Sequence, residues 1–261
     1  MKLVAIGDNC IDFYEQTNQA FSGGNAVNVA VYFHRNGGES AYIGAVGTDE
    51  FGQVLLNGLK AKGVDVSHVH VEEGTTAVTQ VELVNGDRVF GDYNEGVMEH
   101  FKLREEDYEF IKNFDIVTSG FWGHVHQDFK YFHEQGIKTA FDFATKLDDP
   151  LVGEVIPYID YAFFSYDGED INWIKEFMKK LHHYDGQLII VTRGDKGSIV
   201  YDGKDFHEFG IIPCEVVDTI GAGDSYIAGF LMASLKGLPI VERMKFGAET
   251  SAVTIGYNGA W

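Results

Sequence analysis

The sequence predicts an α/β fold: a doubly wound, mostly parallel central sheet with helices on both faces. Short runs of β-branched and aromatic residues alternate with helix-length segments, and this alternation is typical of parallel sheets. The length of 261 residues suits one large α/β domain. Because ligands of such sheets bind beyond the carboxyl ends of the strands, we expect the functional site there.

The predicted strands are short apolar runs whose composition favours a buried sheet. They are Lys2–Ile6, Ser40–Ile43, Ile116–Ser119, Lys138–Phe143, Tyr161–Phe164 and Leu188–Thr192. The predicted helices lie between the strands, and glycine follows several of them as a stop signal. They are Asn25–Asn36, Phe51–Lys62, Asp128–Gln135 and Glu169–His183, with Gly37, Gly63, Gly136 and Gly186 as the glycines.

One segment departs from this alternation. Thr76–Val84 and Arg88–Tyr93 are rich in alternating β-formers and flank Asn85-Gly86, a strong hairpin signal. A lone hairpin is marginal in water, so a further strand is expected, with Ile11–Tyr14 or the stretch after it as the candidate. Two interpretations stay open: an edge extension of the main sheet, or a separate lid that excludes water from a reaction.

Composition narrows the class of protein. No repeat or Pro/Ser-rich linker interrupts the chain, so we expect a single domain over residues 1–261, with the lid at about residues 11–20 and 75–95. The 40 acidic and 20 basic residues give a net charge of −20, which disfavours nucleic acid and anionic membranes as partners.

Further features favour a cytoplasmic location. No apolar stretch approaches the roughly 18 residues of a membrane span, and the first apolar run is too short for a signal peptide. Cys10 and Cys214 lie far apart in the sequence. We interpret both as reduced thiols of a cytoplasmic protein.

The most informative stretch is residues 216–225, Val-Val-Asp-Thr-Ile-Gly-Ala-Gly-Asp-Ser, which precedes the apolar helical run Tyr226–Leu235. A strand that enters Gly-Ala-Gly and then a helix places backbone N–H groups where an anion is favoured. Asp224 is placed to take a proton from a hydroxyl that attacks phosphorus. The alternative is structural, with Asp224 as a helix N-cap and the glycines as a tight turn.

The usual phosphate-binding fingerprints are absent, because the chain has neither G-x-x-x-x-G-K-[ST] nor G-x-G-x-x-G after a strand. This disfavours a Walker-type nucleotidase and a dinucleotide-dependent oxidoreductase. A second glycine pair, Gly23-Gly24, precedes the helix that carries Asn28. Glycines allow a ligand close to the backbone, and Asn28 suits hydrogen bonds to sugar hydroxyls, with simple helix capping as the alternative.

Residues 218–224 and the run Gly-Gly-Asn-Ala-Val-Asn at residues 23–28 resemble the two signatures of the ribokinase, or PfkB-type, family of sugar kinases. The resemblance spans nearly the whole chain. It implies a ribokinase-like fold and phosphoryl transfer from ATP, with Mg²⁺, to a sugar hydroxyl. Asp224 is then the base, and the amides of Gly221, Ala222 and Gly223 stabilise the transferred group.

Other positions match the family one by one. Asp12 resembles the aspartate that grips sugar hydroxyls, and Thr192 and Gly194 resemble the nucleotide-side loop. Asp142 and Lys146 resemble the D-x-N-x-R element, with alanine and lysine where the family has asparagine and arginine. Lys146 is expected to meet the γ-phosphate of the nucleotide as a point charge.

The magnesium ligands are open. After the strand at residues 161–164 the family often has N-x-x-E, whereas this chain has Ser-Tyr-Asp-Gly-Glu at residues 165–169. Mg²⁺ usually keeps several waters. Asp142, Asp167 or Glu169 therefore remain candidates for holding it through water.

Local runs at residues 6–9, 89–98, 121–124 and 259–261 resemble the branch of the family that acts on fructoselysine, a sugar joined to the ε-amine of lysine. Asp92 and Glu95 suit a cationic substrate, and Phe121 and Trp122 suit an aliphatic lysine chain. Solvated lid charges are the alternative, as are a kinase of free fructose or ribose and, less favoured, a non-catalytic binding protein.

Two further interpretations concern metal and partners. His124 and His126 would share one face of a strand, but no third ligand is evident, so a metal site is not expected there. The lid hairpin has an open edge and an apolar face with Val81 and Leu83. A second lid packing on this face would cover both, and the resemblance also implies a homodimer through the lid.

Overall fold

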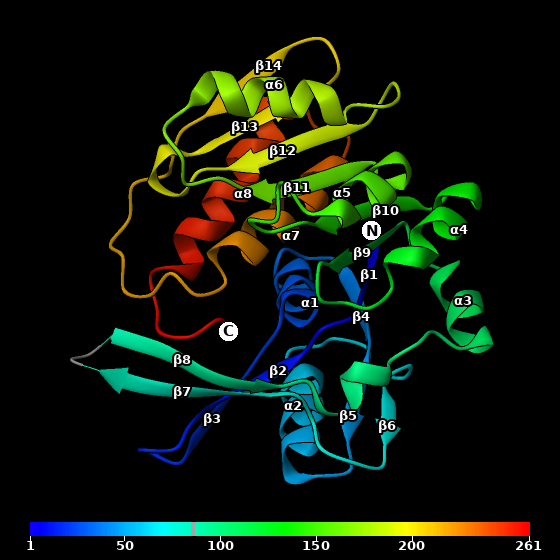
Figure 1. The fold of residues 1–261 in the computed structure, drawn as a ribbon, viewed down its shortest axis with the longest axis vertical. Helices are drawn as coiled ribbons and strands as arrows, with labels where there is room; N and C mark the ends of the chain where they lie inside the picture. The colour runs from blue at the N-terminus through cyan, green and yellow to red at the C-terminus, as the bar shows by residue number, and fades with distance from the viewer. Residues whose placement is uncertain (85–86) are drawn as a thin grey trace.

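The computed structural model describes residues 1–84 and 87–261. Its main sheet has eight strands in the order β14-β13-β12-β11-β10-β9-β1-β4 (Figure 1). From β4 to β12 neighbours are parallel, and β13 and β14 add an antiparallel edge. The strands are β1 (Lys2–Ile6), β4 (Glu39–Ile43), β9 (Ile116–Gly120), β10 (Lys138–Asp142), β11 (Tyr161–Ser165), β12 (Leu188–Thr192), β13 (Ser198–Tyr201) and β14 (Phe206–Phe209).

Helices cover both faces of this sheet, so successive strand residues are buried in different cores. Leu3 and Ala5 of β1 belong to one core and Val4 and Ile6 to the other. The first core contains residues of α1 (Asn25–Arg35), α2 (Glu50–Ala61), α7 (Ala222–Leu235) and α8 (Ile240–Thr254). The second contains residues of α3 (Glu105–Ile111), α4 (Phe129–Glu134), α5 (Pro150–Val155) and α6 (Ile171–Leu181).

The predicted fold class is confirmed, and the six predicted strands and four predicted helices all exist. Helix α6 is shorter than Glu169–His183 because the Asp170 side chain caps it, accepting from the backbone N–H groups of Asn172 and Trp173. The sequence analysis missed α3, α5, α8 and the edge strands β13 and β14. Short 3₁₀ turns complete the structure: η1 (Gly96–His100), η2 (His126–Asp128), η3 (Ile156–Tyr158) and η4 (Gly194–Lys196).

The hairpin belongs to a separate four-stranded sheet, which we call the lid, in the order β3-β2-β7-β8. Its strands are β2 (Cys10–Tyr14), β3 (Gln19–Gly23), β7 (Val78–Val84) and β8 (Asp87–Asn94). The edge-extension interpretation is therefore wrong, whereas the expected extra strand is β2. The predicted turn at Asn85-Gly86 lies outside the described residues. Beneath the lid, Phe13 packs on Phe51 of α2 with ring centroids 5.4 Å apart, and β5 (Ala45–Gly47) pairs with β6 (His70–Glu72).

Three sequence interpretations need correction. Residues 210–221 contain no strand before α7, because the N–H groups of Val217 and Asp218 donate to the Ile255 carbonyl after α8 instead of to a sheet. His126 lies in η2, so it shares no strand face with His124. Val81 is only 2% exposed within one chain, so it offers no open apolar face.

The homodimer through the lid stays a prediction. Among the lid side chains that the structure describes, the large apolar ones that are exposed are Phe21 at 48% and Tyr93 at 46%. No helix among the described residues is long and apolar enough to cross a membrane.

We expect Gly24→Ala to destabilise the fold by about 3 kcal/mol or more, and Gly37→Ala by only about 1 kcal/mol. Both glycines have positive φ, +110° and +89°. A Cβ at Gly24 would lie 2.7 Å from Cα of Asn9, whereas a Cβ at Gly37 would meet nothing within 4 Å. Urea unfolding of the two variants measures the difference. Equal losses of stability would show that close backbone packing before α1 is not the constraint.

Candidate active site

The site lies where two strand ends meet the N-termini of α1 and α7. Asp142 is the last residue of β10, and Asp8 lies two residues after the end of β1. Asn25 is the first residue of α1, and Asp224 is the third residue of α7. The parallel strands bring these four residues together at one edge of the sheet, as predicted for this fold class.

Neutral amides hold the three carboxylates. The side-chain Nδ2 of Asn25 donates to Asp142 Oδ2 at 2.8 Å and to Asp224 Oδ1 at 2.7 Å. The backbone N–H of Asn25 donates to Asp8 Oδ2 at 2.7 Å. Asn28 Nδ2 donates to the other oxygen of Asp224, at 2.7 Å. Each oxygen of Asp224 therefore accepts one amide hydrogen.

This arrangement excludes the capping alternative for Asp224. The N-cap of α7 is Gly221, which is left-handed at φ 74°. The Asp224 side chain points across to α1 instead of back to its own helix. Its hydrogen bonds orient the carboxylate for a role outside the helix.

The cluster is electrostatically unfavourable for charged carboxylates. Burial raises the pKa of Asp224 to about 7; the charge of Asp142 adds to this rise, and the hydrogen bond from Asn28 opposes it. Burial also raises the pKa of Asp142 to about 6 and the pKa of Asp8 above its ordinary value. Among the described residues, no lysine or arginine pairs with any of the three. A bound cation would therefore be stabilised here.

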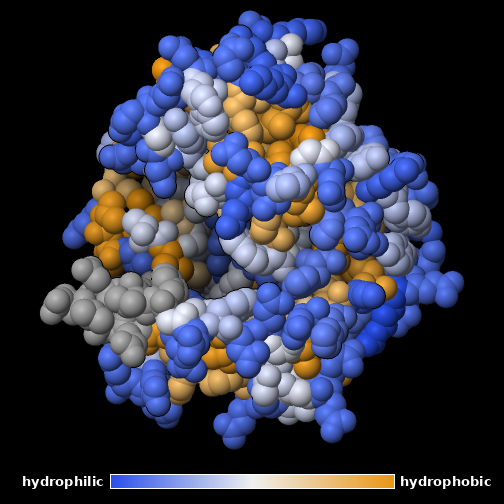
Figure 2. Space-filling view, in the orientation of Figure 1, coloured by the Kyte–Doolittle hydropathy of each residue, from blue (hydrophilic) through white to orange (hydrophobic). Residues whose placement is uncertain are grey.

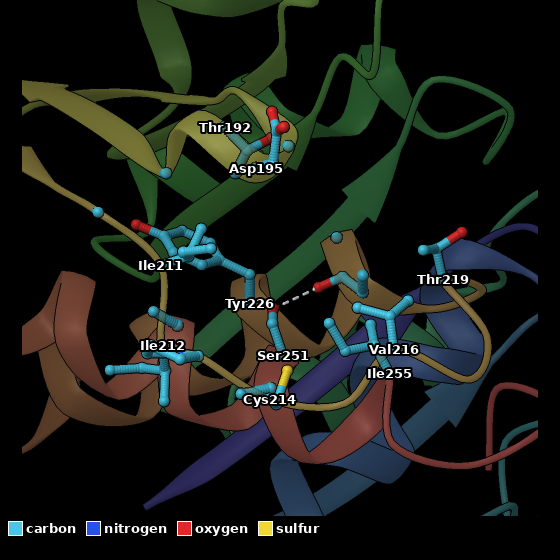
Figure 3. Close-up of a pocket in the computed structure, with 18 of the residues that line it drawn as sticks. Thr192, Asp195, Ile211, Ile212, Cys214, Val216, Thr219, Tyr226, Ser251 and Ile255 are labelled. Carbon is cyan, nitrogen blue, oxygen red and sulfur yellow. Dashed lines mark hydrogen bonds between the residues drawn. The ribbon is translucent and has the colours of Figure 1, made fainter.

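The N-terminus of α7 separates this cluster from a cavity of about 610 Å³. Ala222 and Gly223 line the cavity from the helix, and Thr219 lines it from the preceding loop. Figure 3 shows Thr192 and Asp195 at one end and Cys214 and Ser251 at the other. The apolar wall is formed by Ile211, Ile212, Pro213, Val216, Ala248, Ala252 and Ile255.

The predicted anion pocket is present in part. The Ala222 N–H donates to the Thr219 carbonyl at 3.2 Å. No backbone carbonyl of the described chain accepts from the N–H of Gly221 or Gly223. Two of the three predicted amides are thus open to an anion at the positive end of α7.

The other predicted nucleotide and metal residues divide into two groups. Thr192, Gly194 and Asp167 line the cavity. Lys146 is exposed outside it, with Nζ 5.8 Å from the ring centroid of Phe121. Glu169 is exposed too, and its carboxylate pairs with the ammonium of Lys196, so the structure does not bring it to the cavity.

The lid carries the remaining predicted substrate residues, and Figure 2 shows the surface recessed between the lid and the body of the molecule. A Cβ at Gly23 would lie 3.7 Å from Asp12 Oδ2, so the Asp12 carboxylate lies over the first glycine of the pair. Asp92 is exposed on β8. Glu95, just past β8, pairs with Nε2 of His124 at 3.0 Å and connects the lid to the loop after β9.

Sequence reasoning missed Asn25, Asp8 and Trp261 as members of the site. Trp261 Nε1 donates to Asn28 Oδ1 at 2.7 Å. Both ends of the Asn28 amide are therefore engaged, so any sugar contact of Asn28 must share atoms already used to hold Asp224. An acid just after a buried strand was a usable signal for Asp8, and Asn25 and Trp261 lie in runs that resemble the family, but neither run indicates which side chains these two residues contact.

Residues 2–261 match the pfkB family of carbohydrate kinases, and the chain belongs to that family. It is 48% identical to fructoselysine 6-kinase of Shigella flexneri over 259 residues, 99% of either chain. It is 37% identical to the fructosamine kinase FrlD of Bacillus subtilis over 269 residues, covering 100% of this chain and 93% of the relative.

Solved structures agree on the fold. Arabidopsis thaliana ribokinase in complex with ribose and ATP superposes with a TM-score of 0.88 at 23% identity, over 99% of this chain and 93% of that one. A ribokinase II structure from E. coli with ATP and Mg²⁺ gives a TM-score of 0.84 at 19% identity, over 99% and 94%. The chain thus has the ribokinase-like fold and is a carbohydrate kinase.

We expect stability to fall as pH rises from about 4 to about 7, because the folded chain retains protons that the unfolded chain has released. The pKa of Asp224 rises from 3.8 to about 7 and that of Asp142 to about 6. Their contribution is therefore full below 3.8 and is lost as pH passes the folded values. Urea midpoints between pH 4.5 and 8 should show a flatter decline for Asp224→Asn than for the parent chain. The exposed Asp185→Asn is the control, and equal slopes for all three proteins would refute the buried cluster as the cause.

Proposed function

We propose that this chain transfers the γ-phosphoryl group of ATP to the terminal 6-hydroxyl of fructoselysine, with Asp224 as the general base. The observation that carries the proposal is the placement of Asp224 at the N-terminus of α7. Its carboxylate lies on one side of the helix end, and the Gly223 residue beside it lines the cavity on the other. The similarity to fructoselysine 6-kinases supports this choice of substrate.

The cavity suits a nucleotide. Its volume of about 610 Å³ falls in the range of small-molecule sites, and apolar walls with few polar groups are typical of them. Ile211, Val216 and Ile255 offer apolar faces to a purine ring, and Thr192 offers a polar atom at the opposite end. The open amides of Gly221 and Gly223 favour phosphate at the helix end.

Oxygen ligands suit Mg²⁺, and either Asp142 or Asp167 would hold it through water; the two residues lie on different sides of the α7 N-terminus. Asp167 lines the cavity and Asp142 shares the Asn25 amide with Asp224. Glu169 is less suited because it is paired with Lys196. Mg²⁺ bound with the nucleotide would supply positive charge that offsets the negative charge of the phosphates.

The residues then act in a defined order. Asn25 and Asn28 orient the Asp224 carboxylate toward the substrate hydroxyl. Asp224 accepts the hydroxyl proton as the hydroxyl oxygen bonds to the γ-phosphorus and the bond from that phosphorus to the leaving oxygen of ADP breaks. The amides of Gly221 and Gly223 stabilise the charge of the transferred group.

The lid region supports a glycated amine over a free sugar. Asp92 on β8 and Glu95 just past it give the lid negative charge, and the linking amine of fructoselysine is cationic. Trp122 is 46% exposed and lies 5.5 Å from Phe121, ring centroid to ring centroid. Because Lys146 already faces the Phe121 ring, Trp122 is the better surface for the aliphatic lysine chain.

We expect Asp224→Asn to keep the fold and nucleotide binding but to lower kcat by about 10²–10⁴, the usual contribution of a positioned base. In the parent enzyme kcat/KM should rise with pH through about 7, because the base must lose the proton that burial stabilises. Coupled ADP-release assays from pH 5.5 to 9 measure both effects. Turnover of Asp224→Asn near the parent value would remove Asp224 from the mechanism.

We expect fructoselysine to have a higher kcat/KM than fructose or ribose, with ADP release dependent on Mg²⁺. In the double variant Asp92→Asn, Glu95→Gln the KM for fructoselysine should rise about tenfold, as loss of one partly exposed charge contact predicts. The KM for free fructose should change little. Glu105→Gln with Glu106→Gln, on α3, is the matched charge control. If the parent enzyme had the higher kcat/KM for fructose or ribose, the fructoselysine assignment would fail and only the carbohydrate-kinase assignment would remain.

A further inference from the structure

The last residues of the chain fold back onto the catalytic helices. The Gly259 N–H donates to Asp218 Oδ2 at 2.8 Å, just before the Gly-Ala-Gly turn. The Tyr32 hydroxyl of α1 donates to the Ala260 carbonyl, and Ala260 is 8% exposed. Figure 1 shows this end of the chain near α1. Residues 257–261, which we call the C-terminal strap, are thus held against both α1 and the loop before α7.

The strap places the Trp261 indole against α2 as well. A Cβ at Gly58 would lie 3.3 Å from the indole ring, so glycine leaves room for the ring in the middle of α2. Lys62, the C-cap residue of α2, places its Nζ 5.7 Å from the centroid of the indole ring. Helix α2 also packs against the lid, through the contact of Phe51 with Phe13. The helix that contacts the indole is therefore itself fixed by packing.

The hydrogen bond from this indole determines which way Asn28 faces. An indole N–H only donates, so it must meet the oxygen of the Asn28 amide. With Oδ1 facing Trp261 at 2.7 Å, Nδ2 faces Asp224 at 2.7 Å. The amide turned by 180° would set its oxygen against a carboxylate and its NH₂ against an N–H. Both contacts would be repulsive.

We propose that Trp261 is a positioning residue of the phosphoryl transfer: through Asn28 it maintains the hydrogen bond that orients the Asp224 carboxylate. The inference rests on the proposed role of Asp224 as base. Without the indole N–H, the Asn28 amide loses one of the two contacts that fix its orientation, so its hydrogen bond to Asp224 is weakened and the charged form of Asp224 is less stabilised. The other titratable groups around Asp224 are Asp142 from β10, Asp8 after β1 and Tyr32 from α1.

Trp261→Phe keeps an aromatic ring but removes the N–H donor together with part of the indole ring. We expect kcat/KM for the sugar substrate to fall about 5- to 15-fold, the effect of one hydrogen bond, and the pH at half-maximal kcat/KM to rise. The KM for ATP should stay the same. Trp173→Phe, on the exposed side of α6, is the matched control. In an Asn28→Ala background Trp261→Phe should have no further effect, because the two residues act through one path.

An unchanged pH profile, or a full additional loss in the Asn28→Ala background, would overturn the proposal. A second measurement is independent of turnover and of any variant at Trp261. In the ¹⁵N-labelled parent protein the indole signal of Trp261, assigned with Trp122→Phe and Trp173→Phe, should titrate with Asp224 and stop titrating in Asp224→Asn. An indole signal that does not shift as Asp224 titrates would also refute the link from Trp261 through Asn28 to Asp224. If Asp224→Asn retains turnover while the indole signal of the parent protein titrates with Asp224, the base assignment fails and the structural link stands.

Discussion

The structure depends on keeping three carboxylates close together, Asp8 buried and Asp142 and Asp224 half-buried, with only neutral donors bonded to them. Asp8, Asp142 and Asp224 meet where α1 and α7 begin, and Asn25 contacts all three. The positive ends of the two helices offset part of the negative charge. Amides are suited to this role because a lysine or arginine here would form a salt bridge that holds Asp224 ionised but too weak a base to accept a proton.

This constraint explains why the chemistry is divided across a single helix end. A carboxylate that faced the same way as an anion-binding amide pocket would repel the anion that the amides bind. In α7 the Asp224 side chain turns toward α1, whereas the adjacent Gly223 faces the cavity. The absence of a side chain at Gly223 leaves the space beside that amide open. The Asp224 carboxylate and the Gly223 amide thus face different sides of the first turn of α7, although they belong to adjacent residues.

Periodicity and motif spacing were sufficient to predict the parallel sheet, its first six strands and the position of Asp224. Those features depend on local apolar runs and on a contiguous Gly-Ala-Gly-Asp turn. The edge strand β14 was missed because its side chains are partly exposed and its apolar residues are interrupted, whereas β13 is largely buried but only four residues long. Asn25 and Trp261 were missed for a different reason, since their roles come from contacts across about two hundred residues of sequence.

The stability cost of the cluster also bears on how the enzyme selects its ligands. A chain with net charge −20 that also buries uncompensated carboxylates binds cations with a gain that neutral ligands cannot provide. On the proposed function, Mg²⁺ would bring positive charge to the acids at the strand ends, and a substrate with a protonated amine would bring it to Asp92 and Glu95 of the lid, so each would relieve repulsion between carboxylates. A neutral free sugar would relieve less of this repulsion than a glycated lysine.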